Sequence, residues 1–99
     1  MQTIKISQIQ FEAKFTPFEN AKLLKKYFEK TKKFNPYLIC TPECSNIITN
    51  DNKYLINNTT FENDCPILKM AKLYAKENSI NINIGSLLLK VKNKKKLVN

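Results

Sequence analysis

The chain has 99 residues, which is enough for one domain and too few for two. Hydrophobic residues make up 42% of it and charged residues 25%, which excludes a disordered chain, and one Gly with four Pro excludes a flexible linker. His is absent, so no imidazole can act as a general base or bind a metal here. Because no apolar run approaches the roughly 20 residues of a membrane span, we expect no membrane partner.

The formal net charge is +9, and all seventeen basic residues are Lys. Arg is the favoured residue for bidentate recognition of phosphate and guanine, so its absence disfavours sequence-specific binding of nucleic acid. The dominance of Lys, Asn and Ile is typical of an AT-rich coding sequence. The charge therefore reflects codon usage more than a polyanionic partner.

The cysteines are odd in number, Cys40, Cys44 and Cys65, and no signal segment precedes them. This usage predicts a reducing compartment, the cytoplasm. Their spacing lacks the fourth ligand of a structural zinc site, so we expect no metal and no cofactor.

The chain begins with the pattern of a strand followed by a helix. Residues 3–10 alternate apolar and polar side chains, which is typical of a strand. Thr16, Pro17 and Glu19 then form a capping box, in which the Thr16 hydroxyl accepts from the Glu19 amide. Apolar positions follow at helical spacing: Ala21, Leu24, Phe28 and Thr31, with Leu23, Tyr27 and Phe34 widening the stripe.

Asn35 and Pro36 end this helix, because proline disfavours helical geometry in the residue before it. Residues 38–41 then form a short apolar strand, closed by Pro42. This strand, helix and strand make one βαβ unit. Such units follow the right-handed crossover rule, so we expect the two strands to be parallel in one sheet, with the helix on one face. From residue 44 to residue 64 the chain is polar and aperiodic, which predicts a long loop.

The second half predicts a helix and three more strands. Asp64 is expected to cap the helix, with Pro66 in its first turn and an apolar face of Ile67, Met70, Ala71 and Tyr74. Residues 80–84 and 87–92 form strands separated by Gly85 and Ser86, and a turn at Asn93 and Lys94 returns the chain through residues 95–99. The predicted class is α/β, in the order β-α-β-α-β-β-β.

The segment from Leu38 to Glu43 delivers a carboxylate to the carboxyl edge of the sheet, where ligands and catalytic groups gather. At this point the chain resembles the carbon-nitrogen hydrolase superfamily, which includes the nitrilases and aliphatic amidases. The resemblance runs through nearly the whole chain: the strand of residues 5–11, the helix beginning near Asn20, Leu38-Ile39 leading into Pro42-Glu43, the helix with Ala71 and Ala75, and the strand into Gly85-Ser86. Tyr37, where the family commonly has Asp, and the polar Asn81 and Asn83 depart from the pattern.

The resemblance implies a nitrilase-like α-β-β-α sandwich, of which residues 1–99 would be a single partial domain, the amino-terminal portion. It also implies a Glu-Lys-Cys triad that cleaves non-peptide amide or nitrile bonds through a thioester. Glu43 takes the position of the Glu, the general base that accepts the thiol proton. In the family the Lys and the Cys come from later strands, so we expect this chain to be an incomplete fragment that is inactive alone.

The three cysteines have other expected roles. Cys44 is adjacent to Glu43, but neighbouring side chains on an extended segment point to opposite sides, so we do not assign it as the nucleophile. Cys40 is predicted to be a small buried hydrophobe, and Cys65 to open a helix.

Three functions remain as alternatives. The first is a hydrolase that takes a small amide substrate only when its missing part is supplied. The second is a small basic module that binds nucleic acid through the lysines of the first helix and of residues 90–96, although Phe28 and Phe34 are better explained as core than as a stacking platform. The third is a structural half that self-associates or reassembles with a downstream fragment, because helices on one face of a single sheet leave the other face uncovered.

Overall fold

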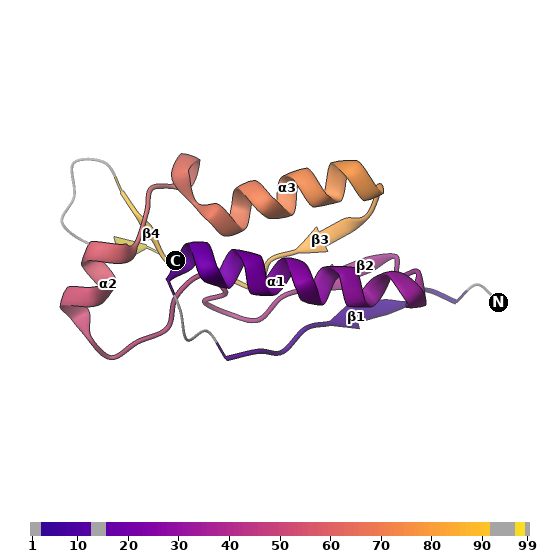
Figure 1. Ribbon diagram of the computed structural model, residues 1–99, viewed down its shortest axis with the longest axis horizontal. Coiled ribbons are helices and arrows are strands. Elements are labelled where there is room, and N and C mark those ends of the chain that lie inside the picture. Colours follow the sequence, from indigo (N-terminus) through magenta and orange to yellow (C-terminus); the bar gives the residue numbers. More distant parts are fainter. Residues whose placement is uncertain (1–2, 13–15, 92–96, 99) are drawn as a thin grey trace.

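The computed structural model describes residues 3–12, 16–91 and 97–98 of the chain (Figure 1). The elements, with η marking a short 3-10 turn, are β1 (Ile6–Gln8), α1 (Pro17–Thr31), η1 (Lys32–Phe34), β2 (Leu38–Cys40), α2 (Asn52–Asn58), η2 (Glu62–Asp64), α3 (Pro66–Asn78), β3 (Asn81–Asn83), β4 (Leu89–Lys90) and β5 (Leu97–Val98). The predicted α/β class is confirmed.

The capping box at the start of α1 forms in part as the sequence predicts. The Thr16 hydroxyl accepts a hydrogen bond from the Glu19 amide at 3.3 Å, and Pro17 occupies the first turn. The four residues of the predicted apolar stripe are all buried: Ala21, Leu24, Phe28 and Thr31. The prediction for Phe34 is wrong, because η1 follows the helix and leaves that ring 54% exposed. Asn35 then turns the chain with a positive φ of 48°.

The first three strands form one parallel sheet in the order β1-β2-β3, so the predicted parallel βαβ arrangement is confirmed. Each strand is shorter than its sequence pattern. In register across the sheet, Ser7, Ile39 and Ile82 share one face. Ile39 is fully buried on this face, in the core that α1 and α3 cover.

The opposite face of this sheet is open among the residues described. Ile6 stands in register with Leu38 and Asn81 on this face, and it is 57% exposed. Asn83 lies on the same face, one pleat further along β3. The two asparagines that depart from the family pattern therefore point away from the helices, where a polar side chain stays hydrated.

The second long helix, α3, packs beside α1 (Figure 1). Its apolar face is as predicted for Ile67, Ala71 and Tyr74, which are buried, and the Tyr74 ring lies 5.2 Å from the Phe28 ring between centroids. The predicted cap is wrong. Cys65 is the N-cap residue and makes no side-chain capping bond, because Asp64 already belongs to the 3-10 turn η2.

The loop predicted for residues 44–64 contains the helix α2. The predicted order β-α-β-α-β-β-β therefore lacks this helix. Asp51 caps α2 by accepting from the Tyr54 amide at 3.1 Å. The helix buries none of its residues, which is why it has no apolar periodicity to detect. Farther along, β4 and β5 pair antiparallel as a hairpin, as predicted, while the expected turn at Asn93 and Lys94 lies outside the described residues.

None of the helices in the ranges described is long and apolar enough to cross a membrane.

Candidate functional site at the carboxyl edge of the sheet

Glu43 lies just beyond the carboxyl end of the central strand β2, on the edge where parallel strands place their ligands. The backbone ladder continues past the strand, since the Thr41 amide donates to the Asn83 carbonyl at 2.9 Å. On the other side, the Ile9 amide donates to the Cys40 carbonyl at 2.9 Å. The edge that leads to Glu43 is therefore held by both outer strands.

A small cavity of about 120 Å³ lies at the carboxyl ends of β1 and β2. It is lined by Gln8, Ile9, Gln10, Cys40, Thr41 and Pro42. Pro42 directly precedes Glu43, but the Glu43 side chain is exposed and is not part of the lining. The carboxylate thus stands at the expected edge in a hydrated position.

The turn that carries Glu43 is fixed by buried hydroxyl groups. Ser45 is 1% exposed, and its hydroxyl is hydrogen-bonded to the Thr41 hydroxyl at 2.9 Å and to the Pro42 carbonyl. The Thr41 hydroxyl oxygen also accepts a hydrogen bond from the Gly85 amide at 3.2 Å. Because buried polar groups cost stability unless they are hydrogen-bonded, these contacts hold the turn in one conformation.

A second set of bonds ties the turn to the segment that follows β3. The Cys44 amide donates to the Ser86 hydroxyl at 2.8 Å, and the Ser45 amide donates to the Ser86 carbonyl at 3.1 Å. Cys44 has a positive φ of 49°, a left-handed conformation that is uncommon for residues other than Gly. The Ser86 contacts hold this unfavourable backbone in place.

Asn46 connects this turn to two other segments of the chain. Its Nδ2 donates to the Leu88 carbonyl at 2.8 Å, and its Oδ1 accepts from the Leu88 amide at 3.0 Å. Its own carbonyl accepts from Asn20 Nδ2 of α1 at 2.8 Å. Asn46 is fully buried, so it links α1, the turn and the segment before β4 through a single side chain and its backbone.

Gly85 allows the two segments to approach each other. A Cβ atom at this position would lie 2.5 Å from the Thr41 carbonyl oxygen and 2.8 Å from the Pro42 carbonyl carbon. Both contacts are closer than real Cβ atoms allow, and both are with backbone. Gly85 is the only glycine in the chain, so the sequence itself offers a signal that two backbone segments approach closely here.

The burial of the three cysteines agrees only in part with the prediction. All three thiols are free, with Cys65 buried and Cys40 and Cys44 half-buried, so Cys40 is less enclosed than predicted. Cys44 stands in a turn, so the extended geometry that argued against it as a nucleophile is absent. Within the ranges described, no group of three His, Cys, Asp or Glu residues is placed to hold a metal ion.

The sequence predicted the place of Glu43 at this edge but did not point to Ser45 and Asn46, which fix its turn, and Ser86 was quoted only for the resemblance. Their partners in the other segment lie about 40 residues away along the chain, and no local pattern marks such a contact. Neither a scan against protein-family models nor a search of curated proteins finds a match to this chain. The family resemblance therefore rests on the residues quoted from this sequence.

Proposed function

We infer that this chain supplies the general-base side of a carbon-nitrogen hydrolase site, within the amino-terminal part of a nitrilase-like α-β-β-α sandwich. One observation carries the proposal: Glu43 follows the carboxyl end of the central parallel strand, on a turn fixed by buried hydrogen bonds. A turn with a fixed backbone at this edge suits proton transfer, since catalysis requires the base to start from a defined position near the reacting group.

In the proposed reaction, Glu43 accepts the proton of a thiol, and the resulting thiolate attacks the carbonyl carbon of an amide. The C–N bond then breaks, the amine leaves with that proton, and water cleaves the thioester to release the acid. The resemblance assigns the thiol and a Lys to later strands. Glu43 is exposed in this chain, so the proposal requires the part that carries the Lys and the Cys to cover it.

We predict that residues 1–99 alone release no amine or ammonia from simple amides. The chain joined to a downstream segment that supplies the Lys and the Cys should hydrolyse them. Glu43→Gln should then lower kcat/KM by at least about 100-fold, because general-base catalysis contributes roughly that much. Ammonia release measured for each protein checks this.

Glu62→Gln is the matched control, since it removes another exposed carboxylate, from η2. It should leave turnover unchanged, and both variants should unfold at the parent's denaturant midpoint. Turnover by the isolated chain that needs Glu43 would show that the site is complete without the missing partners. A downstream frame without Lys and Cys, an inactive joined chain, or one unaffected by Glu43→Gln would overturn the assignment of the base.

We also propose that the chain associates with itself, or with a completing fragment, through the open face of the sheet. Ile4 and Ile6 are exposed isoleucines on the strand segment that forms one side of this face. A domain of this size buries a limited core, so covering such a face is favourable. The free thiols suit a reducing compartment, which supports the cytoplasm as the place of assembly.

Ile4→Thr with Ile6→Thr is expected to weaken self-association by about tenfold, because it removes apolar surface and keeps β-branched residues in the strand. Sedimentation velocity over a range of concentrations measures this. The control is Ile48→Thr with Ile56→Thr, two isoleucines of similar exposure outside this sheet. A parent chain that stays monomeric and melts cooperatively, or a control pair with the same effect, would contradict the prediction.

A further inference from the structure

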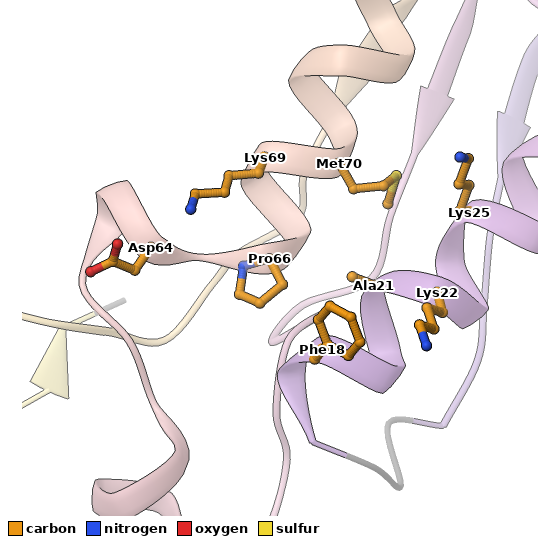
Figure 2. Close-up of a pocket in the computed structure, with 8 residues that line it drawn as sticks. All are labelled: Phe18, Ala21, Lys22, Lys25, Asp64, Pro66, Lys69 and Met70. Carbon is orange, nitrogen blue, oxygen red and sulfur yellow. The ribbon is translucent and has the colours of Figure 1, made fainter.

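A groove lies between the amino-terminal halves of α1 and α3 (Figure 2). Its volume is about 410 Å³, and it is lined by Phe18, Ala21, Lys22, Lys25, Asp64, Pro66, Lys69 and Met70. A cavity of this volume falls within the range of small-molecule sites. It is not lined by any residue of the candidate hydrolase site.

The walls of the groove are apolar. Phe18 and Pro66 approach each other from the two helices, with Ala21 and Met70 beside them (Figure 2). The Phe18 ring is 59% exposed, so its contribution to the groove is uncovered apolar surface. An occupant with an apolar body would displace water from these walls.

The rim of the groove is predominantly cationic. Lys22 and Lys25 come from α1 and Lys69 from α3, and Asp64 is the only acidic residue in the lining. The Lys22 ammonium lies 4.7 Å from the centroid of the Phe18 ring, which holds one positive charge at the apolar wall. An apolar wall next to this excess of ammonium groups is complementary to a molecule with an apolar body and a negatively charged head.

We propose that the groove binds a small amphipathic carboxylate, an acyl or aryl acid whose apolar part packs against Phe18, Pro66 and Met70. Its carboxylate lies at the cationic rim, where Lys22, Lys25 and Lys69 give an excess of positive charge over Asp64. This binding is independent of the hydrolase proposal, because no residue of the Glu43 turn takes part.

Binding to the full chain is measured by titration calorimetry and by amide chemical shifts, with decanoate as the probe below its micelle-forming concentration. Decanol and decylammonium have the same alkyl chain with a neutral or a positive head. We expect decanoate to bind at least about fivefold more tightly than decanol, and decylammonium more weakly than either. The largest shift changes should fall on Ala21, Lys22 and Met70.

Variants at the rim should move the affinity in opposite directions. Lys25→Gln with Lys69→Gln is expected to weaken decanoate binding by about three- to tenfold, whereas Asp64→Asn should strengthen it by about twofold. These side chains are exposed, so the substitutions leave the core intact. Lys30→Gln with Lys76→Gln is the matched control, because it removes the same charge from the same two helices outside the groove lining.

Phe18→Ser tests the apolar wall, with Phe34→Ser as the control at a similarly exposed ring away from the groove. Only Phe18→Ser should weaken binding of decanoate and decanol alike. Equal affinities for decanoate and decanol, an equal loss in the Lys30 and Lys76 control, or shift changes centred on Ile6 and Leu38 would overturn the proposal. Glu43→Gln should bind decanoate like the parent, whether or not the hydrolase assignment holds.

Discussion

Gly85→Ala should lower the free energy of unfolding by about 3 kcal/mol, because the added methyl group meets backbone atoms that cannot rotate away. The nearest of these is the Thr41 carbonyl oxygen, at 2.5 Å. Separating the two segments would stretch the bond from the Gly85 amide to the Thr41 hydroxyl and the bond from the Cys44 amide to the Ser86 hydroxyl. Thermal unfolding followed by circular dichroism should show a Tm lower by more than about 10 °C.

Asn83→Ala is the control for this substitution. It introduces the same methyl side chain two residues earlier, at an exposed position on the open face of the sheet. Its expected effect is below about 0.5 kcal/mol. A Gly85→Ala protein that melts within about 2 °C of the parent, with unchanged amide shifts from Thr41 to Ser45, would show that the close approach is not required.

Asn46→Ala should cost about 3 kcal/mol, since it removes both hydrogen bonds to Leu88 and leaves that residue's amide and carbonyl without these partners. Each partly buried backbone group that loses its partner costs roughly 1–3 kcal/mol. Urea denaturation measures the difference in unfolding free energy.

Asn57→Ala provides the comparison, because Asn57 is exposed on α2 and Asn46 is fully buried. It should change stability by less than about 0.5 kcal/mol. Asn46→Asp separates the two bonds, because it keeps the acceptor for the Leu88 amide and loses the donor to the Leu88 carbonyl. If Asn46→Ala were as stable as the parent, the contact between the turn and the segment before β4 would not contribute to stability.

The helices and the parallel sheet could be predicted where local chemistry and burial agree. The Thr16 cap and the spacing of Leu24 and Phe28 fixed α1, because its first turn and its buried face are both encoded within one short segment. The predictions failed for Phe34 and for α2, where local chemistry and burial disagree. Phe34 is apolar but follows the last helical turn, and α2 forms through its Asp51 cap without a buried face.

The position of Glu43 at the sheet edge could be predicted, but its surroundings could not. A carboxylate after a short apolar strand is visible in the sequence, and parallel pairing then places it at the carboxyl edge. The bonds of Cys44 and Asn46 reach Ser86 and Leu88, and such pairings depend on how strands pack rather than on local pattern. The lone Gly85 was the one available sign that two backbones meet closely.

The dependence of the Glu43 turn on distant residues also sets when it can form. Asn46 cannot engage Leu88, and Cys44 cannot engage Ser86, until a loop of roughly 40 residues has closed. Contacts at such sequence separation are formed late when a protein folds, after helices such as α1. During synthesis, a chain released only through Asn46 would lack Ser86 and Leu88, so the turn that carries Glu43 would gain its fixed conformation only after those residues emerge.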